Sequence, residues 1–133
     1  MSGAAFPLQA ALYEALAGDG ALMALISAVY DHVPADAALP YLQIGEATVS
    51  DWSAVGLDGE EHALTLHVWT ADHGLRSAKA IMGEVKRVLD GAELTVAGHH
   101  LVMLAFTFGQ TLREEDGRIQ HGVMRFRATL HSI

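Results

Sequence analysis

Eight histidines are the side chains in this sequence best suited to chemistry, because neutral imidazole is a common ligand of zinc, copper and iron. Their spacing argues against a shared ion. His99 and His100 are neighbours, so on a strand their side chains would point to opposite faces. His62 and His67 are an odd number of positions apart and would diverge in the same way, and the other histidines lie in separate segments. The pattern therefore predicts no metal site.

Nucleophilic catalysis has no better support in the sequence. The chain has no cysteine and no Gly-x-Ser-x-Gly motif, so a Ser, His, Asp set could arise only by assembly in space. The glycines at 56 and 59 suit a turn, but their segment lacks the lysine and the glycine spacing of phosphate and dinucleotide loops. We expect no catalytic residue and no cofactor. A small α+β enzyme or ligand-binding domain is the alternative from another functional class.

The net charge of −8 argues against a grip on nucleic acid, because binding to phosphates requires Lys and Arg to replace counterions. Only eight basic residues are present, most of them in the segments 79–87 and 113–127. An acidic chain can still face DNA as a wall that repels it. We therefore expect no specific nucleic-acid binding.

The length of 133 residues fits one domain, residues 1–133, because single cores typically occupy about 100–200 residues. Apolar residues make up 51% and charged residues 18% of the chain, which predicts that some apolar surface lies at subunit contacts. No apolar run reaches the roughly 18 residues of a membrane span, and the first residues lack a signal-type core. We expect the protein to stay where it is made, and the absence of cysteine suits a reducing cytoplasm.

The first half of the chain predicts two helices followed by two strands. Apolar residues at helical spacing indicate a helix from Pro7 to Ala17, and Asp19 is placed to cap a second, short helix. Tyr41 to Val49 has the composition of a strand, and Val49 to Glu61 is polar enough to be a long loop. His62 to Ala71 alternates with a period of two, as expected of a half-buried strand.

The second half predicts a helix and a hairpin. Leu75 to Leu89 has one apolar face, and His100 to Thr111 is a strand that is apolar on both faces and so requires cover on both. Asp116-Gly117 favours a tight turn, after which Arg118 to His131 returns as the partner strand. The fold class is α+β: a mostly antiparallel sheet of about four strands, with a long helix packed on one face and two N-terminal helices. The amino-terminal helices or a neighbouring subunit would cover the other face.

Three groups of aromatic residues suggest an interaction surface, because Tyr and Trp give large, rigid contact areas with a polar group. Tyr41 follows a proline, and His67 and Trp69 share one strand face. The more ordinary interpretation of Tyr41 and Trp69 is that they are partly buried core residues. Trp52 lies between Asp51 and Ser53 with few apolar neighbours, so it is predicted as an anchor at an interface.

Several short segments occur in an order that resembles one family, the tail completion and tail terminator proteins of long-tailed phages, prophages and gene transfer agents. The resemblance runs nearly the full length. After an amphipathic helix come Asp19-Gly20-Ala21-Leu22, the segments 29–34 and 39–41, Gly45-Glu46, Asp51-Trp52, His67-Val68-Trp69, the helix 79–89 and the segment 121–127. Family members often carry a basic residue after the Trp-containing strand, whereas this chain has Thr70-Ala71-Asp72-His73.

The resemblance implies a homo-oligomeric ring, commonly a hexamer, at the neck of the particle and assembled in the bacterial cytoplasm. Such a ring caps the tail tube, contacts the major tail tube protein and the head connector or stopper protein, and leaves a channel for DNA, with no membrane involved. A head completion or stopper protein of the same connector is the closer alternative. The interface candidates are Tyr41, Glu46, Asp51, Trp52, His67, Trp69, Arg113, Arg125 and Arg127. The lumen candidates are Glu60, Glu61, Glu114, Glu115 and Asp116.

Overall fold

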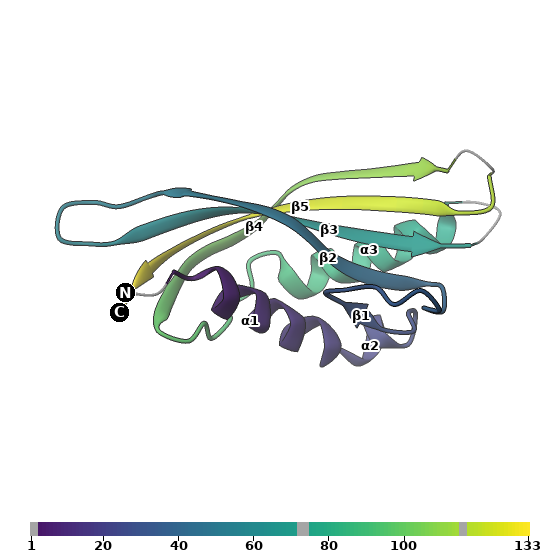
Figure 1. Ribbon diagram of the computed structural model, residues 1–133, viewed down its shortest axis with the longest axis horizontal. Helices are drawn as coiled ribbons and strands as arrows, with labels where there is room; N and C mark the ends of the chain where they lie inside the picture. The colour runs from purple at the N-terminus through teal and green to yellow at the C-terminus, as the bar shows by residue number, and fades with distance from the viewer. Residues whose placement is uncertain (1–2, 72–74, 115–116) are drawn as a thin grey trace.

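A five-stranded sheet forms the frame of the protein, and the helices lie along one side of it (Figure 1). The computed structural model describes residues 3–71, 75–114 and 117–133, and all counts refer to these. The strands follow the order β1-β2-β3-β5-β4. Their bounds are Val29–Tyr30 for β1, Tyr41–Asp51 for β2, Gly59–Thr70 for β3, His99–Arg113 for β4 and Gln120–Ser132 for β5.

The helices begin and end close to the predicted positions. Helix α1 spans Ala5–Ala17, with the proline in its first turn, and α2 spans Gly20–Met23. Asp19 caps α2 as predicted, its Oδ1 accepting a hydrogen bond of 2.9 Å from the Leu22 amide. Helix α3 spans Arg76–Leu89 and buries the four residues Ala78, Ile81, Val85 and Leu89, which recur at helical spacing.

The α+β class is confirmed, but the sheet differs from the prediction in strand number and direction. Strand β1 pairs in parallel with β2, whereas the other neighbours are antiparallel, so the sheet is mixed and has five strands instead of about four. The sequence did not indicate β1 because two residues are too few to show an alternation. The cis bond between Leu39 and Pro40 lies just before β2.

The hydrophobic core lies between the sheet and the helices. Strand β5 supplies Met124, Phe126, Ala128 and Leu130, all buried and all on one face, as their alternation predicted. Helix α1 packs its buried leucines into the same core. Helices α1 and α2 therefore lie on the same side as α3, and no helix of the described chain covers the opposite face (Figure 1). We call this opposite face the open face.

The predicted long loop from Val49 to Glu61 is wrong. Strands β2 and β3 continue pairing through this region, with Val49 opposite His62 and Asp51 opposite Glu60, and only residues 52–58 connect them. Main-chain hydrogen bonds hold the strands together here although the side chains are polar, because one ladder can continue beyond the core that it covers. The result is an extended hairpin, residues 48–62, which we call the arm and which projects beyond the helices (Figure 1).

Strand β4 also differs from the expectation that both its faces are covered. It is an edge strand with register shifts between Leu101 and Met103 and between Phe106 and Phe108. Each shift exchanges the two faces, so Leu104 and Phe106 face the core whereas Phe108 lies opposite Arg125 on the open face. The sequence of β4 therefore looks apolar on both faces only because the core-facing positions change at each of the two register shifts.

No helix in the described part of the chain is long and apolar enough to span a membrane.

Candidate assembly interface on the open face

Paired strands bring the aromatic and imidazole side chains together on the open face. Tyr41 lies opposite Trp69 in the β2–β3 register, and Trp69 lies opposite His121 in the β3–β5 register. Residues that are directly opposite in antiparallel strands share a face, so these side chains form a row across three strands. His67 lies next to this row and opposite Val123. The structure thus joins Tyr41, His67 and Trp69, all predicted interface residues.

The centre of the open face is a cluster of Glu46, His67, Trp69 and His121, which we call the His67 cluster. His67 Nδ1 lies 2.7 Å from His121 Nε2, and His67 Nε2 lies 2.8 Å from Glu46 Oε1. The rings of Trp69 and His121 are stacked, with centroids 3.8 Å apart. The Trp69 indole N–H donates to Gln43 Oε1 at 3.2 Å. Every member of the cluster therefore has a fixed neighbour.

The proton positions within the His67 cluster follow from its contacts. A carboxylate can only accept, so His67 Nε2 carries a proton and donates it to Glu46. The hydrogen bond between the two imidazoles needs one proton, on either His67 Nδ1 or His121 Nε2. If both of these nitrogens carried a proton, two donors would face each other. The pKa of His121 is lowered by burial and by the charge on His67, while Glu114, 3.5 Å away, opposes this shift. The hydrogen bond from His67 lowers the pKa of Glu46.

Charged side chains border the cluster on the same face. Arg127 is ion-paired with Glu61, and the guanidinium carbon of Arg125 lies 5.2 Å from the centroid of the Phe108 ring. Glu46 lies close enough to Arg125 for that charge to favour its carboxylate form. Three further predicted interface residues, Glu46, Arg125 and Arg127, thus lie on the open face with the aromatic row.

The remaining predicted interface residues lie elsewhere. Asp51 and Trp52 are on the arm, where 39% of Trp52 is exposed and its main chain pairs with Gly59. Arg113 ends β4 at the other end of the sheet, beside the β4–β5 connection (Figure 1). The open face therefore does not include them, and the arm is a separate exposed segment with its own apolar residues.

The lumen candidates are not brought together. Glu60 accepts a hydrogen bond from the Ala4 amide at 3.1 Å and contacts the buried His62, so it holds the start of α1. Glu61 pairs with Arg127, and Glu114 lies near His121 at the opposite end of the sheet from the arm. Glu115 and Asp116 lie outside the described residues. Each described lumen candidate thus has a partner within the subunit.

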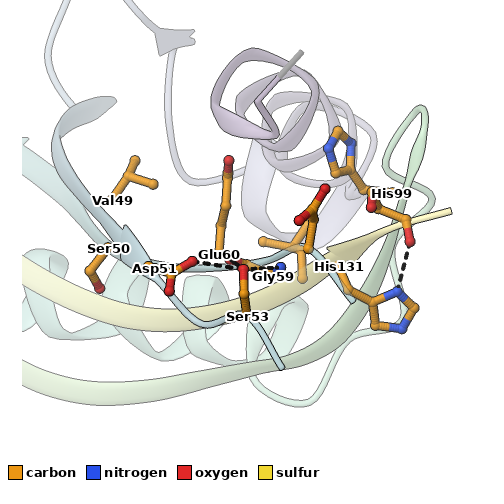
Figure 2. A pocket seen from close by; sticks show the side chains of 11 residues that line it. Val49, Ser50, Asp51, Ser53, Gly59, Glu60, His99 and His131 are labelled. Carbon is orange, nitrogen blue, oxygen red and sulfur yellow. Dashed lines mark hydrogen bonds between the residues drawn. The ribbon is translucent and has the colours of Figure 1, made fainter. Parts of the chain in front are cut away.

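A pocket at the base of the arm contains the residue types that a nucleophilic site would need (Figure 2). Ser53 Oγ donates to Asp51 Oδ1 at 2.7 Å and accepts from the Gly59 amide at 3.0 Å. His99 and His131 line the same pocket, but each ring nitrogen Nδ1 bonds a main-chain carbonyl at 3.0 Å. Among the described residues no hydrogen bond joins Ser53 to either imidazole, and its hydroxyl instead closes the turn of the arm.

Metal binding finds no matching geometry in the described chain. Among residues 3–71, 75–114 and 117–133, no three His, Cys, Asp or Glu side chains are grouped so as to hold an ion. Glu46, His67 and His121 form a linear series in which each contacts the next, whereas a chelating set must converge on one point.

Sequence reasoning missed His121 and Phe108 as members of this surface. Both lie opposite predicted residues, Trp69 and Arg125 respectively, but their registers depend on strand pairings that the sequence does not specify. For Phe108 the register shift in β4 removed the signal that alternation would have given. His121 begins the segment 121–127 on which the family resemblance partly rests, and that was the available signal.

The fold and this surface define a small α+β domain with an extended hairpin and a sheet face that its own helices leave open. The chain belongs to the family described as "Tail completion protein gp17", whose model matches residues 10–131. This membership confirms the family resemblance that the sequence indicated, and with it the link to phage tail completion.

Individual relatives agree with that assignment. The protein called "Tail completion protein gp17" of Bacillus phage SPP1 is 27% identical over 127 residues, covering 94% of this chain and 92% of the relative. A chain in the structure titled "Virion of native gene transfer agent (GTA) particle" superposes with a TM-score of 0.91 at 33% identity, over 99% of this chain and 100% of that one. The structure of bacteriophage SPP1 gp17 gives a TM-score of 0.66 at 25% identity, over 95% and 90% of the two chains.

Proposed function

We propose that this protein is a structural subunit of a phage-like particle or gene transfer agent, and that copies of it form a closed ring, most simply a hexamer. In this proposal the ring caps the tail tube, joins it to the head connector at the neck, and performs no catalysis. The major tail tube protein lies on one side and the connector or stopper protein on the other, and DNA passes through the channel without specific binding. Its subunits are made in the cytoplasm and function in the particle.

One observation carries this proposal. The chain matches a component of a gene transfer agent particle over 99% of its length, and its own helices leave the open face, with the His67 cluster, uncovered. In a ring at a tube end such a face would be covered by a neighbouring subunit, the tail tube protein or the connector protein, because symmetry gives every copy the same neighbours. The acidic net charge agrees with a structural role beside DNA, because an acidic surface offers few binding sites for phosphates.

Particles produced without this chain test the proposal. If the chain normally caps the tube, particles made without it have nothing to end tube growth or to join the tube to a head. Heads and tails should then be separate, and the tails should be irregular in length. Adding the purified chain back should restore joining. Electron microscopy of complete particles should show the ring at the neck.

The same experiment separates the alternatives. A stopper closes the head, so its loss should give heads that lose DNA while tails keep a regular length. An enzyme or ligand-binding protein would leave particle architecture unchanged when deleted. Complete, joined particles in the absence of the chain would overturn the proposed function.

A further inference from the structure

The charges of this chain are divided between its two halves. Residues 1–75 contain ten Asp and Glu and no Lys or Arg, a formal charge of −10. Residues 76–133 contain six acidic and eight basic residues, a formal charge of +2. The two values sum to the net charge of −8. A division this complete matters only if the fold keeps the halves apart in space.

The sheet topology keeps most of these charges apart, and the two halves meet at the ion pairs Arg87–Asp19 and Arg127–Glu61. The order β1-β2-β3-β5-β4 places the strands of the first half on one side of the sheet and those of the second half on the other. Helices α1 and α2 belong to the β2 side, and α3 carries four of the eight cations of the second half, Arg76, Lys79, Lys86 and Arg87. The molecule therefore has an acidic edge at β2 and, on the opposite side of the sheet, a basic edge at β4.

The acidic edge contains an apolar groove along α1 and β2. Phe6, Tyr13 and Ile44 line it, and Phe6 is 77% exposed. Glu14 and Asp31 border the same groove, both exposed and neither ion-paired within the described residues. Strand β2 pairs with β1 only at Leu42 and Gln43, so the rest of its outer side is a free edge.

The basic edge has the complementary composition. Three large apolar residues are exposed on β4: Val102, Phe108 and Leu112. Lys86 Nζ lies 4.7 Å from the Phe106 ring and Arg125 lies over Phe108, and in the described chain neither is ion-paired with an acid. On the outer side of β4 the Phe106 amide donates to Asp90 Oδ1, and the Leu104 carbonyl accepts from the Gly91 amide. Because these main-chain groups are already bonded, a partner at this edge would contact mainly side chains.

We propose that the ring is built by head-to-tail contacts in which the acidic, groove-bearing β2 edge of one copy receives the basic, apolar β4 edge of the next. This inference rests on the proposed function and adds which surfaces join. Apolar centres with charged borders of opposite sign are the usual composition of a protein–protein interface. Because the two surfaces differ, the contact is heterologous, and repetition of a heterologous contact closes into a ring when the rotation allows.

Charge reversal in the complete chain tests this contact by sedimentation velocity across a wide concentration range at low salt. The acidic-edge variant combines Glu14→Lys and Asp31→Lys, and the basic-edge variant combines Lys86→Glu and Arg125→Glu. Each should weaken self-association about tenfold or more, since rim charges of the same sign then oppose each other. A mixture of the two variants, or one chain carrying all four changes, should associate again. Added salt should weaken wild-type association.

Two controls make the result specific. The acidic-edge variant makes the protein less negative, and a smaller net charge by itself favours association. A loss of association in this variant therefore cannot come from overall repulsion between copies. Asp58→Lys on the arm makes the same change in net charge as Glu14→Lys alone; the Asp58 variant should leave self-association at the wild-type level, whereas the Glu14 variant should weaken it. Circular dichroism establishes that each variant is folded.

Three outcomes would overturn the proposed contact. Either one-edge variant could associate as strongly as the wild type, the mixture could fail to associate, or the wild-type chain could stay monomeric at every concentration. Particle images and the deletion experiment would be unaffected by these outcomes, so the proposed function can stand when this contact fails.

Discussion

The indole ring of Trp69 and the imidazole ring of His121 are stacked across β3 and β5, with 8° between their planes. Both rings are only partly buried, and they lie on the face away from the core. We expect Trp69→Ala to lower the free energy of unfolding by about 1–2 kcal/mol, because an aromatic pair adds roughly 0.5–1.5 kcal/mol to its area burial. The fold should persist while head–tail joining is lost, as measured by urea denaturation and by particle reconstitution. Leu25→Ala, at another exposed apolar residue, is the control and should leave joining intact.

The His67 cluster makes stability depend on pH in a defined window. Burial and the His67 charge lower the pKa of His121 below its usual 6.5, so the unfolded chain binds a proton that the folded chain resists. This contribution is fully present above pH 6.5 and falls as the pH drops towards the lowered pKa. His121→Gln should therefore show a smaller loss of urea resistance than wild type between pH 7.5 and 5.5. Equal losses in both proteins would contradict the assignment.

Two glycines predict opposite effects of the same substitution. A Cβ on Gly59 would lie 2.4 Å from the carbonyl oxygen of Trp52, so Gly59→Ala must displace the main chain of the arm. A Cβ on Gly83 in α3 meets nothing within 4 Å, and Gly83→Ala should stabilise the protein by about 0.5–1 kcal/mol through helix propensity. Tryptophan fluorescence should change only in Gly59→Ala, and thermal denaturation should rank the variants in opposite directions around wild type.

The exposed tip of the arm gives a prediction about partners. Trp52, Val55 and Leu57 are all exposed there, and an exposed apolar group on a projecting hairpin favours contact with another protein. Trp52→Ala should therefore impair joining and leave the unfolding midpoint nearly unchanged. A large fall in the midpoint would show instead that Trp52 stabilises the fold.

The channel proposal predicts an effect of charge at the β4–β5 connection. Replacing Glu114, Glu115 and Asp116 together by Lys should give particles that assemble but package or eject DNA poorly, because basic residues in a channel would bind phosphates. Failed ring formation would indicate a subunit contact instead. Normal assembly together with normal DNA transfer would exclude both roles.

The sequence predicted helices and core faces well because local periodicity encodes them. The capping role of Asp19 and the buried face of β5 both follow from spacing within one element. The register shifts in β4, the parallel β1 and the contact between His67 and His121 arise between elements. Pairing geometry determines them, and a single sequence contains no local signal for it.

The arm is a second case in which composition alone does not predict strand pairing. Ser50, Asp51 and Asp58 are polar, and each is exposed as this composition indicates. Exposure does not argue against a strand, because two strands can remain paired by main-chain bonds alone once a buried sheet has fixed their register. The aromatic candidates were predictable from residue type, whereas their common surface was not.

One extra residue in β2, between Ile44 and Ala47, changes which residues of the strand face the core. Before this bulge the odd-numbered residues face away from the core, and after it the even-numbered residues do. Three steps along β2, from Ile44 to Ala47, lie opposite two steps along β3, so deleting one residue there would restore regular pairing and leave every residue of the arm with its partner and its face. A deletion at this one position therefore removes a single side chain, such as that of Glu46, from the open face without altering the register of the arm.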